Sequence, residues 1–217
     1  MTRPMARGRF ITLEGGEGAG KSTQIARLAD RLIQAGIDVV TTREPGGTPG
    51  AEAIRGLLVA GDTDRWDGLT ETLLHTAARR AHVEGLVRPA LDAGRWVVCD
   101  RFVDSTVAYQ GVAQGVGADV VLRLHDLVIG GLMPDLTLVL DLPVDQGLAR
   151  AAGRHARADG DEARYERFGP DFHNRLRAAF HDRVTADPDR CVLIDATGDV
   201  DGVADAVWRA VGDRLSV

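Results

Sequence analysis

Short apolar runs alternate along the chain with longer segments in which apolar residues recur every three or four positions. This alternation of strand-like and helix-like patterns is typical of a parallel sheet whose strands are connected by helices. The apolar runs are rich in Val, Ile and Leu and barely alternate with polar residues, which indicates strands covered on both faces. The pattern predicts five strands, at Phe10–Glu14, Asp38–Thr42, Trp96–Asp100, Leu136–Asp141 and Val192–Asp195.

Three of the segments between or after these runs have the clearest helical spacing. The first ends at Gly36, a residue that favours the C-terminal stop of a helix. The second includes Leu73–Ala81, and we expect it to be kinked or broken near Gly85 and Pro89. The third, over Val203–Leu215, is amphipathic and closes the chain. Together they predict an α/β fold in three layers, a five-stranded parallel sheet flanked by helices.

Residues 153–169 (GRHARADGDEARYERFG) differ from the rest of the chain. They are charged, poor in aliphatic side chains and flanked by glycine. We expect them to form a small mobile lid or a solvated loop, inserted in an otherwise single domain that spans residues 1–217.

Composition excludes several classes of protein. The chain has 217 residues, 26 Lys and Arg against 32 Asp and Glu, and a net charge of −6. This acidic balance argues against a general nucleic-acid or anionic-membrane binder. Cys99 and Cys191 lie in apolar runs, which indicates buried thiols in a reducing compartment. No apolar run approaches the length of a membrane span or a signal peptide, so we expect a cytoplasmic protein.

The segment Gly15–Thr23 (GGEGAGKST) carries the strongest chemical signal. It matches G-x-x-x-x-G-K-[ST], and it lies between a predicted strand and an amphipathic helix, as a phosphate-binding loop (P-loop) must. Lys21 is the only lysine in the chain. Its compact ammonium can reach the β- and γ-phosphates of ATP, where a planar guanidinium is no equivalent. We therefore predict an ATP site with Mg²⁺, formed by Gly15, Gly16, Glu17, Gly18, Ala19, Gly20, Lys21, Ser22 and Thr23.

The single lysine also narrows the class of P-loop protein. A GTPase that reads guanine with an N-K-x-D motif needs a second lysine, which this chain lacks. Motors and large ATPases need a longer chain. A small phosphotransferase or a small ATP-dependent ligase remains.

Asp100 and Arg101 follow a buried strand, and the carboxyl edge of the sheet places both beside the P-loop. Asp100 and the hydroxyl of Ser22 are candidates to hold Mg²⁺, in the case of Asp100 through water. Arg101 is a candidate phosphate clamp, because a guanidinium binds phosphate in a bidentate manner.

Three further motifs carry a resemblance to a known family: TREPGGT at 42–48, TAAR at 76–79 and DRFVDSTVAYQG at 100–111. With the P-loop they resemble the bacterial thymidylate kinases, over Phe10 to Asp195. The resemblance implies transfer of the γ-phosphoryl group of MgATP to dTMP, giving dTDP and ADP, and a homodimer.

The resemblance also implies a set of substrate-binding residues. Arg101 and Arg43 would hold the 5′-phosphate, Glu17 would contact the sugar and metal-bound water, and Tyr109 would crowd C2′. The loop that carries Pro45, whose bond to Glu44 is a candidate cis bond, lies nearby. The base would be contacted by His75, which stands where the family usually has a stacking Phe, and by Arg79, Thr106 and Gln110.

For several of these positions an ordinary structural explanation competes. Arg43 could face solvent beside Glu44, His75 could be a histidine at the edge of the core, and Tyr109 could be a core aromatic. For Thr106 and Gln110 the alternative is helix capping and exposed polar side chains.

The resemblance places the catalytic arginine of chains with an acidic P-loop residue in the lid. Arg154 is the first candidate and Arg157 the second, where a cation delivered by closure would stabilise the transferring phosphoryl group. The family motif Asp-Arg-x-Glu after the lid is changed here to Ala163-Arg164-Tyr165-Glu166.

Two other functions stay open from the sequence. One is a small P-loop kinase that acts on another nucleoside monophosphate or on a nucleoside. The other is an ATP-binding sensor without catalysis, which would lack a second, acceptor site.

Overall fold

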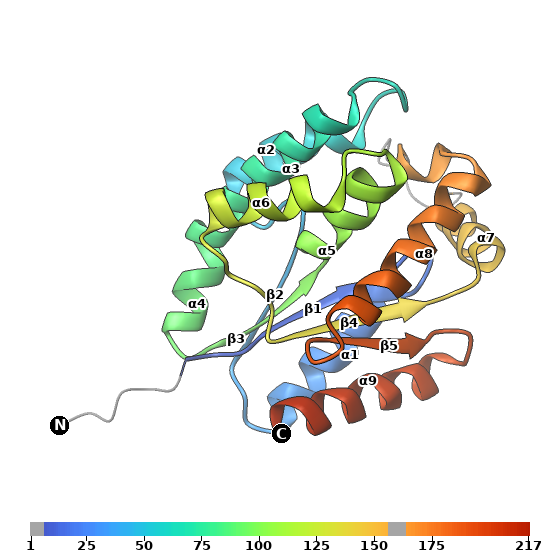
Figure 1. Ribbon diagram of the computed structural model, residues 1–217. Coiled ribbons are helices and arrows are strands. Elements are labelled where there is room, and N and C mark those ends of the chain that lie inside the picture. The colour runs from blue at the N-terminus through green and yellow to red at the C-terminus, as the bar shows by residue number, and fades with distance from the viewer. Residues whose placement is uncertain (1–6, 156–163) are drawn as a thin grey trace.

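The structure is a computed structural model that describes residues 7–155 and 164–217, apart from the side chains of Arg154 and His155. Within these residues one sheet of five parallel strands runs through the molecule (Figure 1). The strands are β1 (Phe10–Glu14), β2 (Val39–Arg43), β3 (Trp96–Asp100), β4 (Leu136–Asp141) and β5 (Cys191–Asp195). The prediction of five strands is confirmed, and each end lies within one residue of its predicted position.

The strand order is β2-β3-β1-β4-β5, so β1 is central. Leu13 of β1 pairs with Asp100 at the end of β3, and Asp100 pairs with Arg43 at the end of β2. This register brings the segments that leave β1, β2 and β3 to one edge of the sheet. Ligands of open α/β sheets bind at this carboxyl edge.

Helices cover both faces of the sheet, which explains the near-continuous apolar strands. They are α1 (Lys21–Gln34), α2 (Pro49–Val59), α3 (Gly68–His82), α4 (Arg88–Asp92), α5 (Val103–Thr106), α6 (Ala118–Ile129), α7 (Val144–His155), α8 (Pro170–Ala186) and α9 (Val200–Leu215). Two π-helical turns, Val83–Val87 and Val107–Ala113, and a 3₁₀ turn at Tyr165–Arg167 complete the described helical segments.

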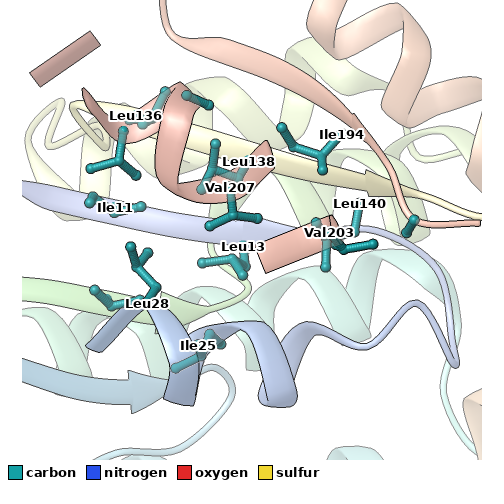
Figure 2. Close-up of a cluster of buried hydrophobic side chains, with 14 of the residues drawn as sticks. Ile11, Leu13, Ile25, Leu28, Leu136, Leu138, Leu140, Ile194, Val203 and Val207 are labelled. Carbon is teal, nitrogen blue, oxygen red and sulfur yellow. The ribbon is translucent and has the colours of Figure 1, made fainter. Parts of the chain in front are cut away.

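One face of the sheet is covered by α1 and α9 (Figure 1). Figure 2 shows the resulting core, in which Ile11 and Leu13 of β1 meet Leu28 of α1 and Val207 of α9. These side chains are at most 1% exposed. Because P-loop and core share β1 and α1, burial of this face fixes the loop between them.

The opposite face packs against α4, α5, α6 and α8 and against the two π-helical turns. The helix that includes Leu73–Ala81 does not break near Gly85. It continues from α3 through the π-helical turn Val83–Val87 into α4, where Pro89 lies in the first turn. Pro89 removes one backbone donor from this continuous helix, directly after the π-helical turn that contains Gly85 and departs from regular α-helical hydrogen bonding.

The ends of the predicted lid are structured. Helix α7 extends to His155, and Arg164 is a fully buried residue rather than part of a solvated loop. Both cysteines are buried and free, as the apolar runs predicted. No helix among residues 7–155 and 164–217 is long and apolar enough to cross a membrane.

Candidate active site

The P-loop leaves β1 and turns tightly before α1 begins at Lys21. Gly15 and Gly18 have φ of 131° and 71°, values that side chains rarely adopt. A Cβ on Gly15 would also collide with the carbonyl oxygen of Leu140, and one on Gly18 with that of Gly147. Two glycines of the loop, Gly15 of the motif and Gly18 at one of its variable positions, are thus required by both backbone conformation and space.

The ammonium of Lys21 folds back over the loop. Its Nζ donates to the carbonyl oxygens of Gly15 at 3.1 Å and Gly16 at 2.9 Å, and the side chain is buried. Burial, followed by the charge of Arg101, lowers the pKa of Lys21 to about 8. The lysine borders a cavity of about 360 Å³, which we call the loop cavity and which is lined by Glu17, Gly18, Ala19, Gly20, Lys21, Ser22, Thr23, Arg43, Glu44, Arg55, Asp100 and Arg101.

Ser22 and Asp100 meet at the floor of the loop cavity. Ser22 Oγ donates to Asp100 Oδ2 at 3.1 Å, and Asp100 Oδ1 is buried without a hydrogen-bond partner among the described residues. A hydroxyl and a carboxylate with a spare oxygen suit Mg²⁺, which takes few protein oxygens beside water and phosphate. The described residues contain no cluster of three or more His, Cys, Asp or Glu that could hold a metal alone.

Arg101 holds the centre of the site, with a φ of 70°. Its Nη1 donates to the carbonyl of Gly15 at 3.1 Å and to Ser105 Oγ at 3.0 Å, and its Nη2 donates to Glu17 Oε1 at 3.0 Å. Tyr109 donates to the same oxygen of Glu17 at 2.6 Å. Burial would raise the pKa of Glu17, but the charges of Arg101 and Lys21 and the bond from Tyr109 prevail and lower it to about 2. Glu17 is therefore ionised, and Arg101 and Lys21 compensate the negative charge of its carboxylate.

A second layer lies behind Arg101. Glu14, at the end of β1, accepts a hydrogen bond from the backbone N–H of Phe102 at 2.7 Å, and its Oε2 lies 2.5 Å from Ser105 Oγ. Burial, and then the nearby charge of Asp104, raises the pKa of Glu14 to about 8. Ser105 thus links Glu14 to Arg101.

A second cavity, of about 140 Å³, adjoins the loop cavity. We call it the acceptor cavity; it is lined by Glu17, Glu44, Pro45, Arg55, Val59, His75, Arg101, Ser105, Tyr109, Gln110, Tyr165 and Glu166. The two cavities share Glu17, Glu44, Arg55 and Arg101. Because the same charged residues border both cavities, a charged group could be transferred between a ligand in one cavity and a ligand in the other. The Glu44–Pro45 bond beside it is cis, as the sequence suggested.

His75 lies in the acceptor cavity, half-buried, with Nε2 3.1 Å from the hydroxyl of Tyr165. Burial, then the charges of Arg79 and Arg101, lowers the pKa of His75 to about 3. Its ring is therefore neutral at physiological pH, and its charge does not vary there as that of an ordinary histidine would. A neutral imidazole at a cavity wall can stack on a base.

Two of the residues that the resemblance placed at the base do not line the acceptor cavity. Arg79 is 2% exposed; it donates to Glu44 Oε2 at 2.7 Å and to Thr106 Oγ1 at 2.9 Å. Arg79 and Thr106 therefore support the wall from behind. Gln110 and Tyr109 do line the cavity. Arg43 borders the loop cavity, 55% exposed, and pairs with Glu52 at 3.2 Å.

Several residues of the site were not found from the sequence. Arg55 of α2 lines both cavities and donates to the carbonyl of Pro45 at 2.9 Å. Tyr165 and Glu166 enter the acceptor cavity from the far end of the predicted lid. The departure Ala163-Arg164-Tyr165-Glu166 was the available signal for the last two, whereas Arg55 belongs to no motif. Arg157 lies outside the described residues, as does the side chain of Arg154.

Comparison with known proteins identifies relatives of this chain over most of its length. The family described as thymidylate kinase matches residues 13–207. The thymidylate kinase of Caulobacter vibrioides is 54% identical over 98% of this chain and all of that protein, and that of Bradyrhizobium sp. (strain ORS 278) is 52% identical over 99% and 94%. A crystal structure of thymidylate kinase from Ehrlichia chaffeensis superposes with a TM-score of 0.74, at 34% identity over 94% of this chain and 99% of that one.

Proposed function

The chain belongs to the thymidylate kinase family and phosphorylates dTMP with ATP to give dTDP, and we propose that it does so by in-line transfer across the wall that its two cavities share. The observation that carries this mechanism is the pair of adjoining cavities with Arg101 between them. The loop cavity is bordered by the P-loop, which suits the phosphates of ATP. The acceptor cavity is lined in part by aromatic and amide side chains, which suit the base of dTMP.

In this mechanism the loop cavity takes the triphosphate of ATP. The backbone N–H groups at the start of α1 bind the β- and γ-phosphates, with Lys21 as the mobile cation. Lys21 Nζ now rests on two carbonyl oxygens of the loop. Exchange of these neutral acceptors for anionic phosphate strengthens its hydrogen bonds.

The acceptor cavity takes dTMP with its 5′-phosphate toward Arg101. Arg101 is anchored by Gly15, Ser105 and Glu17, so its guanidinium is oriented before substrate arrives. Arg43 and Arg55 add positive charge around the loop cavity. Such preorganised cations stabilise the charge that spreads over the transferring phosphoryl group.

Mg²⁺ would be held by Ser22 and, through water, by Asp100. Their spacing and the spare oxygen of Asp100 support this assignment. When bound, the ion neutralises charge on the β- and γ-phosphates. The acceptor phosphate is already an oxyanion, so the chain needs no strong general base, and Glu17 positions Arg101 and the sugar.

The lid contributes the last cation. We propose Arg154 first and Arg157 second, because α7, which carries Arg154, packs against the P-loop at Gly147. Loss of a catalytic arginine of this kind slows phosphoryl transfer by ~10³–10⁵. A single Arg→Ala change that costs less than about tenfold excludes that residue from the role.

The test of the proposed function measures ADP release in a coupled assay with dTMP, dUMP, UMP, CMP, AMP and GMP. The largest kcat/KM is expected with dTMP, and Lys21→Ala should abolish turnover while leaving the circular dichroism spectrum unchanged. Preference for another nucleotide would overturn the assignment, and ADP release with none of them would indicate a sensor.

We also propose a cytoplasmic homodimer. Support for the dimer comes from exposed leucines on α3 and α6, two helices that contact each other. Leu69 is 50%, Leu73 51% and Leu127 81% exposed. Neighbouring exposed apolar side chains mark interaction surfaces. A single species of monomer mass in sedimentation at micromolar concentration would contradict the dimer.

A further inference from the structure

We propose that Glu71, a buried acid behind the acceptor cavity, fixes which hydrogen-bonding groups face the base and so selects pyrimidines that carry a proton on ring N3. The inference rests on the proposed function, because it takes the acceptor cavity as the base site. Glu71 lies on α3 and does not line the cavity, so it acts as a positioning residue through its neighbours.

Glu71 is a fully buried carboxylate surrounded by donors. Its Oε2 accepts from Gln110 Nε2 at 2.9 Å, from Gln114 Nε2 at 3.0 Å and from the hydroxyl of Tyr165 at 3.0 Å. Its other oxygen lies 2.6 Å from Arg164 Nη2, in an ion pair with no exposed surface on either side chain. Arg164 in turn donates to the carbonyls of Leu58, Asp62 and Thr63, which hold the pair in place.

A carboxylate in an ion pair only accepts hydrogen bonds, so each neutral partner must present its donor. For Gln110 this settles the orientation of the amide: the NH₂ group binds Glu71, and Oε1 occupies the opposite branch of the planar group. Gln110 is also a wall of the acceptor cavity. Glu71 therefore takes one of the two amide protons of Gln110 and fixes Oε1 as the acceptor that this side chain can offer the base.

The same logic extends through Tyr165 to His75. The phenol gives its proton to Glu71, so its oxygen accepts from Nε2 of His75, 3.1 Å away. His75 is neutral, with a pKa of about 3, and has one N–H to give. Its Nδ1 is then unprotonated. One buried acid thus sets the direction of hydrogen bonds at two side chains of the cavity wall.

The consequence concerns the edge of the pyrimidine. Thymine and uracil carry a proton on N3, whereas N3 of cytosine has a lone pair in the same place. Gln110 Oε1 would bind the first and repel the second. A site built around one buried hydrogen bond rejects an analogue that cannot make it, since the unpaired groups stay desolvated.

The test compares dUMP with dCMP, which share the sugar phosphate and both lack the thymine methyl group. In Glu71→Gln the new amide can donate to Gln110, so the Gln110 amide is free to flip. The ratio of kcat/KM for dUMP to that for dCMP should fall ~10-fold to 100-fold, mostly through KM, because the base lies away from the reacting phosphate. The ratio for dTMP to dUMP, which reports the methyl group, should stay within about threefold.

Two further variants separate positioning from a general loss of structure. Gln114→Leu removes another donor to Glu71 but does not touch the cavity, and it should keep the dUMP to dCMP ratio. In a Gln110→Leu background, Glu71→Gln should cause no further loss of the ratio. Independent effects of the two changes would show that Glu71 does not act through Gln110.

The outcome is decisive even where Glu71→Gln does not fold. Gln110→Leu alone must then lose the dUMP to dCMP ratio while Gln114→Leu keeps it, and a retained ratio in Gln110→Leu overturns the inference. Failure of the proposed function looks different, because the unaltered enzyme would then fail to phosphorylate dTMP. If the unaltered enzyme prefers dTMP and Glu71→Gln keeps the dUMP to dCMP ratio, the proposed function stands and only the role assigned to Glu71 is overturned.

Discussion

The hydroxyl of Tyr109 donates a 2.6 Å hydrogen bond to Oε1 of Glu17, the atom that also binds Arg101. The acidic residue of the P-loop is thereby tied to the floor of the acceptor cavity. The contact joins a loop that binds ATP to a ring that, in the proposed mechanism, lies under the sugar of dTMP.

Tyr109→Phe tests this contact. The ring that crowds C2′ remains, so preference for dTMP over ribothymidine 5′-monophosphate should persist. Loss of the bond to Glu17 should lower kcat/KM for dTMP by ~10-fold to 100-fold, since one hydrogen bond to a charged group is worth ~1.5–3 kcal/mol. Tyr109→Leu is the contrasting variant and should also lose the sugar preference. Loss of that preference in Tyr109→Phe would contradict the role of the ring.

Arg101→Lys tests the preorganised clamp. A lysine cannot reach Gly15, Ser105 and Glu17 together, as the guanidinium does. We expect kcat to fall by ~10³ or more with little change in the KM for ATP. Arg80→Lys, at a half-exposed arginine on α3, is the matched control and should retain full activity. A loss in Arg101→Lys below about tenfold would remove Arg101 from the transition state.

Affinity for ATP should depend on pH through Lys21. With a pKa of about 8 in the free enzyme, the ammonium is charged below that pH and loses its proton above it. The dissociation constant should therefore be flat below about pH 8 and rise above it, by at most tenfold per pH unit. Calorimetry in two buffers of different ionisation enthalpy should detect proton uptake on binding near pH 8. Equal heats in the two buffers would show that Lys21 is already fully protonated.

Glu14→Gln should change how stability depends on pH. The pKa of Glu14 is raised from 4.5 to about 8 in the folded chain, so over this window the folded state keeps a proton that the unfolded state releases. This contribution to stability is lost as the pH rises through the window. The variant has no proton to lose there, so its free energy of unfolding relative to the unaltered chain should increase with pH and level off above about 8. Urea denaturation across the window measures it, with exposed Glu84→Gln as a control; parallel curves would refute the raised pKa.

His75 is tested by two substitutions. His75→Phe keeps a stacking ring and should leave the KM for dTMP within about threefold, whereas His75→Ala should raise it ~10-fold, as expected for loss of base stacking. Because the pKa of His75 is about 3, the KM of the unaltered enzyme for dTMP should not follow a histidine titration between about pH 5 and 7. An unchanged KM in both variants would mean that the ring does not meet the base.

The strands and the P-loop could be predicted from the sequence because their causes are local. A strand buried on both faces must be apolar throughout, as Phe10–Glu14 is, and a phosphate cradle needs glycine where φ is positive, as at Gly15 and Gly18. The motif after β3 likewise placed Arg101 at the sheet edge, because parallel strands end together.

The supporting residues could not be predicted in the same way. Glu71 and Arg55 lie in helices whose apolar spacing says only which face is buried, not which polar side chain meets a cavity. Arg164 looks like one more charge in a charged segment, yet it is buried because the carbonyls of Leu58, Asp62 and Thr63 converge on it from about a hundred residues away. Only the tertiary fold brings those acceptors together.

The shared wall has a thermodynamic consequence. Glu17, Glu44, Arg55 and Arg101 face both cavities, so no charge can be added on one side without altering the potential felt on the other. In the proposed mechanism donor and acceptor nucleotides therefore influence each other's occupancy, and by linkage the factor is the same in either direction. A substitution at one of these four residues should therefore change the affinity for both nucleotides.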